Sequence, residues 1–87
     1  MTVQEMLRVF RANGVPEHFY VIGGLGGGEC YGLASQDGRW IVYYSERGQR
    51  SILNTFETED AACRKLVDYV DKMMREDFNR PIDMSKT

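Results

Sequence analysis

The residues of this chain that could take part in catalysis are few, and nothing in their spacing sets them apart. His18 is the sole histidine, and Glu17 and Cys30 are its conceivable companions. A general base needs a nucleophile and an orienting carboxylate within hydrogen-bond reach. No cysteine or second histidine stands at metal-ligand spacing from His18. We therefore interpret His18 as a strand-edge histidine and expect no catalytic residues, no metal site and no cofactor.

A glycine-rich stretch, GGLGGG, occupies positions 23–28 and invites comparison with phosphate-binding loops. A dinucleotide-binding motif that began at Gly24 would have Glu29 in place of its third glycine, and no Lys-Ser or Lys-Thr pair follows. The next segment, ECYGLAS, reads as a strand, so no helix N-terminus is available for a phosphate. We expect a flexible connection between two strands.

The two cysteines, Cys30 and Cys63, are far apart and form no C-x-x-C pair. Two buried thiols in a reducing cytosol explain this pattern better than a disulfide or a metal site. The N-terminal segment lacks the continuous apolar core of an export signal, and no run approaches the length of a membrane span. We expect a cytoplasmic protein that does not contact a membrane.

The size and the charge of the chain disfavour two further classes of function, catalysis and nucleic-acid binding. The chain has 87 residues, 43% of them apolar and 28% charged, which is typical of one folded domain. A domain of this size has a small core and little room for a deep catalytic cleft. Its net charge is −2 and it has no block of Lys and Arg, so it lacks the electrostatic features of a nucleic-acid-binding protein. We expect a domain that is not an enzyme and that binds another protein.

A helix is predicted at each end of the chain. Thr2 and Glu5 form a T-x-x-E capping box, and apolar side chains then recur at helical spacing, which predicts a helix over about residues 3–13. Thr58 is the expected N-cap of a second helix, with acidic residues in its first turn and an apolar stripe that extends to about Phe78.

Four strands are predicted between these helices. They cover residues 18–22, 29–35, 39–45 and 49–56. The order α-β-β-β-β-α with short connections predicts an α+β fold, in which a four-stranded antiparallel meander carries both helices on one face. Residues 1–78 form the predicted domain, and the polar segment 79–87 is expected to be a flexible tail.

The two later turns each end in a glycine, Gly38 and Gly48, which is the third of three turn residues. This arrangement predicts a type I turn closed by a G1 bulge. The alternative two-residue type I′ turn requires positive φ at both central positions, which Arg47 disfavours. The three-residue turn predicts that the opposed residues are Ala34 and Trp40, Gly32 and Val42, Cys30 and Tyr44, and Tyr44 and Arg50.

The predicted register divides the apolar side chains of the sheet between two faces. On the first face small residues lie opposite large ones, so a helix could settle there, and we assign this face to the core. The first face carries Cys30, Gly32, Ala34, Trp40, Val42, Tyr44 and Ile52. The second face carries Tyr31, Leu33, Ile41, Tyr43 and Leu53.

The second face would then expose two tyrosines and three aliphatic side chains, a composition typical of an interface. Its predicted anchors are Tyr31, Leu33, Ile41 and Tyr43. Charged residues at its rim are expected to tune encounter and selectivity; they are Glu29, Asp37, Arg39 and Glu46. The faces could also be reversed, or the first helix could cross to the other side, and one aromatic face stays uncovered in either case.

The runs W-x-V-Y-Y-x-E-R-G, at residues 40–48, and F-x-x-E-x-x-A-C, at residues 56–63, give the second half of the chain a family resemblance. It resembles small immunity proteins of bacterial polymorphic-toxin systems, which include contact-dependent, Rhs and type VI-delivered toxins. The resemblance implies a cytosolic toxin inhibitor that binds one cognate toxin domain and blocks its active site or its access to substrate. It implies no catalytic residues and does not identify interface residues.

Two other functions remain open at this stage. The chain could be a structural or regulatory subunit that forms a homodimer through the same uncovered face. It could also be a small enzyme or ligand-binding domain that uses His18, Cys30 and the glycine-rich stretch. Binding of a small anionic ligand would favour the second of these.

Overall fold

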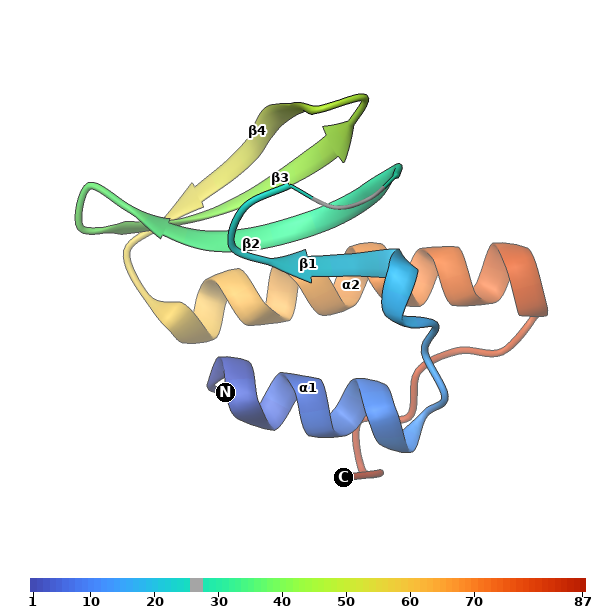
Figure 1. Cartoon of the computed structure of the whole chain (residues 1–87). Helices are drawn as coiled ribbons and strands as arrows, with labels where there is room; N and C mark the ends of the chain where they lie inside the picture. Colours follow the sequence, from blue (N-terminus) through green and yellow to red (C-terminus); the bar gives the residue numbers. More distant parts are fainter. Residues whose placement is uncertain (26–27) are drawn as a thin grey trace.

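The computed structural model describes residues 1–25 and 28–87 and shows an α+β fold with two helices and a four-stranded sheet (Figure 1). The elements are α1 (Val3–Ala12), the 3₁₀ turn η1 (Glu17–Phe19), β1 (Tyr20–Ile22), β2 (Cys30–Gln36), β3 (Arg39–Glu46), β4 (Gln49–Phe56) and α2 (Glu59–Phe78). The order of helices and strands is as predicted. His18 lies in η1 and not in the first strand, which is shorter than expected.

The helix boundaries follow from their capping residues. Thr2 and Glu5 form the predicted capping box at the start of α1, and the Thr58 side chain accepts a hydrogen bond from the Ala61 amide at the start of α2. Helix α2 ends at Asn79, which adopts a left-handed conformation with φ of 53°. Both predicted helices are confirmed.

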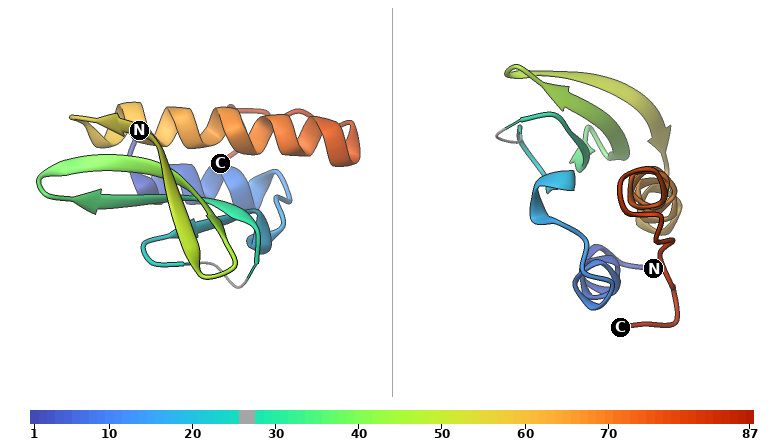
Figure 2. Two further views of the ribbon diagram at one scale, coloured as in Figure 1. Left: turned by 90° about the horizontal axis from the view of Figure 1, so that it is seen from above. Right: turned by 90° about the vertical axis from the view of Figure 1, so that its right-hand side faces the viewer.

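Figure 2 shows both helices on the same side of a curved sheet. The space between the helices and the sheet is filled by buried apolar side chains from the helices, from η1 and the connection before it, and from the two central strands. The core residues are Met6, Phe10, Val15, Phe19, Leu33, Val42, Ala62, Cys63, Leu66, Val67, Val70 and Met74. No helix among the described residues is long and apolar enough to span a membrane.

The sheet is mixed, and the predicted antiparallel meander is therefore wrong for its first strand. The strand order is β1-β2-β3-β4, with β1 parallel to β2 and both later pairs antiparallel. Two neighbouring parallel strands cannot be joined by a tight turn, because the chain must run back to the end of the sheet at which the first strand began. Gly23 and Gly24 begin this return with φ of 73° and 70°, which glycine adopts without strain. The predicted flexibility of the glycine-rich stretch falls partly on residues 26–27, which lie outside the described residues.

Both hairpins close with two residues and not with three. Asp37 and Gly38 have φ of 53° and 77°, and Arg47 and Gly48 have φ of 51° and 76°, which are the positive values of type I′ turns. The flanking pairs are Gln36–Arg39 and Glu46–Gln49. The predicted register is wrong because the twist of the strands favours this turn strongly enough to hold Arg47 in the left-handed region.

The shorter turns shift β2 by one residue against β3, and a shift of one residue moves every side chain of a strand to the other face. We call the side of the sheet toward the helices the helix face, which carries Tyr31, Leu33, Trp40, Val42, Tyr44, Asn54 and Phe56. We call the other side the outer face, which carries Cys30, Gly32, Ala34, Ile41, Tyr43, Ser45, Arg50, Ile52 and Thr55.

Strand β4 contains a bulge at Leu53. Val42 pairs with Asn54 while the next residue, Tyr43, pairs with Ile52, so Leu53 has no partner on β3. A bulge interrupts the alternation of side chains and bends the strand. Even-numbered side chains of β4 therefore lie on the outer face before the bulge and on the helix face after it.

The segment 79–87 lies against the helices, and its end comes close to α1 (Figure 1). The Asn13 side chain donates to the Asp83 carbonyl at 3.0 Å and accepts from the Asp83 amide at 2.8 Å. The Ile82 amide donates to the Asp71 carboxylate at 2.8 Å. These contacts show where the segment lies; its predicted flexibility stays a prediction.

The turn geometry predicts the effect of replacing Arg47 by asparagine. Asn tolerates the left-handed region better than Arg does, so Arg47→Asn is expected to raise the free energy of unfolding by about 0.5 kcal/mol. Urea denaturation measures the change, and Arg39→Asn, in the adjacent extended strand, is the control that should show no gain. A loss of stability in Arg47→Asn would contradict the two-residue turn.

Candidate functional site

The structure does not bring the four predicted anchors onto one surface. Tyr31 and Leu33 lie on the helix face, whereas Ile41 and Tyr43 lie on the outer face. Leu33, Ile41 and Tyr43 are buried, and Tyr31 is partly buried. The predicted open face is therefore wrong, because it depended on the three-residue turns. Whether any of these four residues contributes to binding stays a prediction.

The four predicted rim residues are all exposed, and they lie at opposite ends of the β2–β3 pair. Glu29 precedes β2 and Glu46 ends β3, so both are at one end of the pair. Asp37 lies in the turn and Arg39 begins β3 at the other end. They therefore flank the sheet and do not surround one patch, and their part in binding also stays a prediction.

A cluster of tyrosines that the sequence did not single out joins the sheet to α2. The rings of Tyr31 and Tyr69 stack with centroids 4.6 Å apart, and Tyr44 meets Tyr31 edge-on at 5.2 Å. The Tyr69 hydroxyl donates to the Asn54 side chain at 2.8 Å. The nearby Glu29 carboxylate adds to desolvation in raising the pKa of Tyr44. We assign this cluster to the packing of α2 on the helix face.

The outer face is organised by Tyr43, whose ring lies across Gly32. A Cβ atom at Gly32 would come within 2.3 Å of two ring atoms of Tyr43, so only glycine fits beneath the ring. The Tyr43 hydroxyl donates to the Gly24 carbonyl at 2.6 Å, which fixes the start of the connection from β1 to β2. Burial raises the pKa of Tyr43, so this hydroxyl keeps its proton at neutral pH.

Arg50 lies over the ring of Tyr43 on the outer face. Its guanidinium carbon is 4.8 Å from the ring centroid, a cation–π distance, and one of its nitrogens donates to the Gln36 side chain at 2.9 Å. These contacts span the sheet from β4 to β2. They hold an exposed arginine in one orientation.

Apolar side chains are exposed on the strand that carries this arginine and directly after Gly24. Ile52 is 51% exposed and lies on the outer face, and Leu53, at the bulge, is 41% exposed. Leu25 follows Gly24 and is 48% exposed. Exposed apolar side chains that gather on one side of a domain, and are not scattered singly, are typical of an interaction surface. The register predicted from the sequence places Ile52 on the face that a helix would cover.

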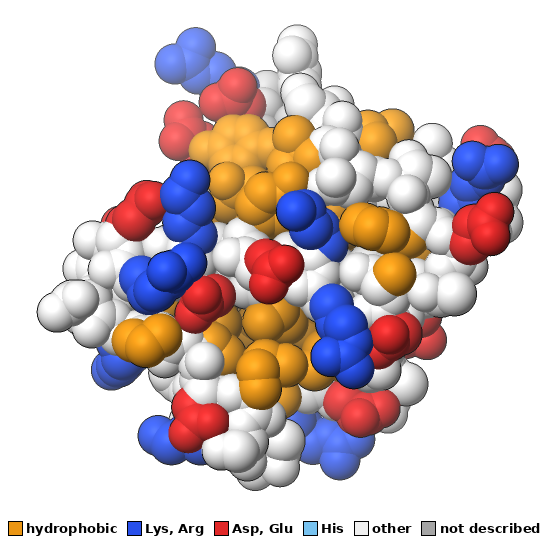
Figure 3. Space-filling view, turned by 180° about the vertical axis from the view of Figure 1, so that it is seen from behind, with side chains coloured by type: hydrophobic (Ala, Val, Ile, Leu, Met, Phe, Trp, Pro, Cys, Tyr) orange, Lys and Arg blue, Asp and Glu red, His pale blue; other side chains and the backbone are white. Residues whose placement is uncertain are grey.

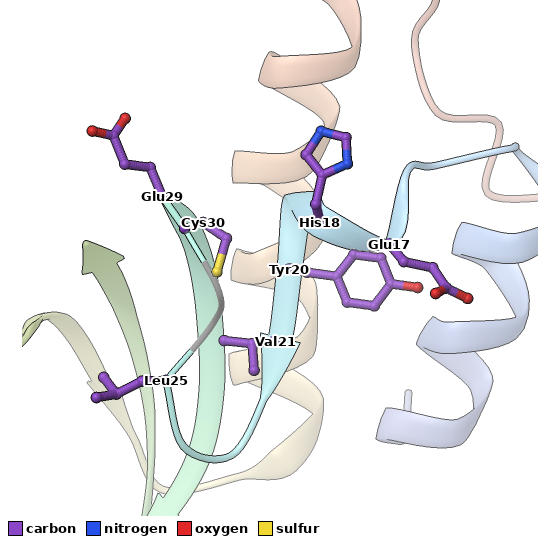
Figure 4. A pocket seen from close by; sticks show the side chains of 8 residues that line it. Glu17, His18, Tyr20, Val21, Leu25, Glu29 and Cys30 are labelled. Carbon is purple, nitrogen blue, oxygen red and sulfur yellow. The ribbon is translucent and has the colours of Figure 1, made fainter. Parts of the chain in front are cut away.

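The residues considered for catalysis line a depression of about 480 Å³ beside β1. Figure 4 shows that Glu17 and Glu29 point to opposite sides of it, and that His18 lies on the turn before β1, away from Cys30. The arrangement shown there brings no base and carboxylate together in the way that nucleophilic catalysis requires. Among the described residues, no group of three or more His, Cys, Asp or Glu side chains could hold a metal ion.

The face behind α2 has a different character (Figure 3). Lys and Arg alternate there with Asp and Glu across the middle, with hydrophobic side chains gathered above and below. Exposed helical pairs explain part of this pattern, because Arg64 binds Asp60 at 2.9 Å and Arg75 binds Asp71 at 3.1 Å. Such pairs contribute little to stability and leave few unmatched charges. The outer face, with Arg50 and Ile52, is therefore the better candidate for a binding surface.

No protein-family model matches the chain, and no significant match was found among curated proteins or solved structures. The resemblance to immunity proteins therefore rests on the two runs at residues 40–48 and 56–63. In the structure the first run forms β3 and its turn, and the second joins the end of β4 to the start of α2. The candidate surface is defined by its geometry alone.

The packing of Tyr43 on Gly32 predicts a large cost for a single methyl group. Gly32→Ala is expected to lower the free energy of unfolding by about 2 kcal/mol or more, because the buried ring must move. Urea denaturation measures this, and Gly28→Ala is the control, since no described atom lies within 4 Å of a Cβ there. Adding Tyr43→Leu to Gly32→Ala should recover part of the loss. Equal losses in the two alanine variants would contradict the close contact.

The buried thiol of Cys63 predicts a loss of stability at alkaline pH. Burial, with a smaller contribution from the Glu59 carboxylate, raises the pKa of Cys63 from 9.0 to about 11. The unfolded chain loses this proton more readily, so the contribution is complete below about pH 9 and disappears as pH rises through 11. It corresponds to about 2 kcal/mol. Unfolding curves from pH 8 to 11 should therefore fall more steeply for the wild type than for Cys63→Ala, and parallel curves would contradict this.

Proposed function

We propose that this chain is an immunity protein, which binds a cognate bacterial toxin domain and blocks its active site or its access to substrate. The observation that carries the proposal is the outer face of the sheet. Neither helix covers it, and Ile52 and Leu53 are exposed on or beside it. The resemblance of the second half of the chain to such inhibitors supports the same conclusion.

The outer face combines features that tight inhibitors need. Few residues dominate most protein interfaces, and they are side chains that are held rigidly and lose water on binding. Arg50 is held by Tyr43 and Gln36, and Ile52 lies two residues further along the same strand. A small domain can in this way bind tightly over a modest area, because few side chains must be ordered on binding. The proposed anchors are therefore Arg50, Ile52 and Leu53, in place of the anchors expected from the sequence.

Inhibition by occlusion requires no catalytic group, metal or cofactor in the inhibitor. It would take place in the cytoplasm. The charged residues at the two ends of the β2–β3 pair, Glu29 and Glu46 at one and Asp37 and Arg39 at the other, would then lie at the margins of the contact. Charges in such positions change the rate of encounter and the choice of partner more than the final affinity.

A homodimeric interaction module is the second candidate, since the exposed apolar side chains of the outer face could also bind a second copy. The two functions differ in the behaviour of the isolated chain. An immunity protein is expected to remain monomeric on its own, whereas the alternative requires a dimer that persists on dilution. Light scattering over a dilution series distinguishes them.

The proposal is tested by co-expressing the chain with the toxin domain encoded immediately upstream. We expect rescued growth and a stable one-to-one complex. Ile52→Asp should weaken the complex by about 100-fold in Kd, because it places a charge in the apolar centre of the contact. Met84→Asp is the matched control, since Met84 is a 41% exposed apolar residue in the C-terminal segment. Failure to bind or rescue would reject the proposal for that toxin, and equal effects of the two variants would reject the outer face.

A further inference from the structure

We infer that Arg50 forms a specific binding site for a carboxylate, and that the occupant is an aspartate or glutamate side chain on the surface of the protein partner. The inference rests on the proposed function for the identity of the partner. The site itself is defined by Arg50 and its neighbours. We therefore expect a negative charge on the part of the toxin domain that the outer face covers.

Arg50 is held in position before any partner binds. An arginine side chain normally loses several rotamers on binding, which weakens the interaction. Here the guanidinium rests on the ring of Tyr43 at 4.8 Å and donates to Gln36 at 2.9 Å. Ala34, on β2, lines the same depression as Arg50, which reaches it from β4 across the intervening strand β3. The fixed guanidinium keeps further N–H donors for a ligand, because it has five in all.

The positive charge of Arg50 has no acidic partner among the described residues. The ion pairs formed by the described residues involve Asp60, Asp71 and Glu76, and none includes Arg50. Arg64, Lys72 and Arg75, in contrast, are each paired with an acidic residue one turn away on α2. An arginine fixed by neutral groups and left without a carboxylate is suited to bind one from outside.

The space beside Arg50 also suits a ligand in its shape and chemistry. Arg50 lines a depression of about 500 Å³ together with Gly23, Gly24, Ala34 and Ser35. Strand β1 pairs with β2 only as far as Leu33, and beyond it no described strand pairs with this edge of β2.

The backbone at this free edge supplies a further donor. The pair that flanks a two-residue hairpin turn is hydrogen-bonded, and here it is Gln36 with Arg39. The backbone N–H groups of successive residues point to opposite sides of a strand. Because the N–H of Gln36 points toward β3, the N–H of Ser35 points away from β3 and toward the free edge of β2. The Ser35 side chain lies on the helix face with its partner Trp40, so the backbone N–H and the guanidinium are the groups that suit an anionic oxygen ligand here.

The neighbouring residues favour a protein carboxylate over a phosphate. Glu59 also lines the depression, and although its carboxylate accepts from the Val3 amide at 2.8 Å, it would repel a doubly charged phosphate more than a carboxylate. The chain has a net charge of −2, which disfavours a nucleic-acid backbone. Ile52, on the same face as Arg50, further predicts that the partner's acidic residue has an apolar neighbour.

The first test uses the isolated, folded chain and needs no toxin. Its ¹⁵N spectra, including the Arg50 Nε–H signal, are recorded during titration with N-acetyl-aspartate amide at constant ionic strength. We expect saturable shifts at Arg50, Ser35 and Gly24 with a Kd in the millimolar range, about what one charge-assisted contact gives in water. Arg50→Gln should abolish the shifts at Ser35 and Gly24. Shifts that persist in Arg50→Gln, or their absence in the wild type, would overturn the inference.

The same titration with inorganic phosphate separates the two kinds of anion. Weaker binding than that of the carboxylate supports the assignment. Phosphate binding that is tighter, and is lost in Arg50→Gln, would overturn it in favour of a phosphate-bearing partner.

The second test uses the toxin complex. Arg50→Gln and Arg50→Lys should each raise the Kd by about 100-fold, because lysine keeps the charge but cannot lie flat on Tyr43 with the same set of donors. Arg47→Gln makes the same change of charge in the adjacent turn and should alter the Kd by less than about threefold. Tight binding by Arg50→Gln overturns the inference and leaves the inhibitor function intact. If no complex forms, the proposed function fails and the anion titration alone decides whether the site exists.

Discussion

The outer half of this structure depends on the contact between the ring of Tyr43 and the bare backbone of Gly32. Because the ring lies flat across β2, its hydroxyl reaches the Gly24 carbonyl and holds the chain as it leaves β1. The same ring supports the guanidinium of Arg50. One aromatic side chain therefore joins three separate parts of the chain: the connection that permits a parallel strand pair, the centre of the sheet, and the arginine of the candidate site.

The sequence predicted most of the elements but not their register. Capping residues and apolar spacing are local signals, and they located both helices; Cys30 and Cys63 are buried, as expected. The turn at Arg47 could not be predicted from residue preference, because its strained φ is imposed by the twist of the two strands that it joins. The parallel pairing of β1 was equally out of reach, since the connection that allows it is held by a hydrogen bond from Gly24 to a residue nineteen positions later.

This single error in turn length explains why the candidate site was misassigned. The alternation of small and large residues between Gly32, Ala34 and their neighbours was recognised, but it was attributed to a helix packing on the sheet. The space over Gly32 is filled by the ring of Tyr43, a side chain of the sheet itself, whereas Ala34 and Arg50 line an open depression. Arg50 and Ile52 carried no signal of their own, because an arginine and an isoleucine in a strand are ordinary until their pairing is known.

The bulge at Leu53 has a consequence for how this protein behaves when it is crowded with copies of itself. Two β4 strands placed edge to edge around a twofold axis would oppose residues of equal parity, yet Arg50 and Ile52 lie on the outer face while Asn54 and Phe56 lie on the helix face. In a register of this kind, a ladder that crosses Leu53 sets side chains of opposite faces against each other, and only a short ladder on one side of the bulge keeps the faces matched. The exposed edge of the sheet at β4 is in this way a poorer template for edge-to-edge pairing than an unbulged strand of the same length.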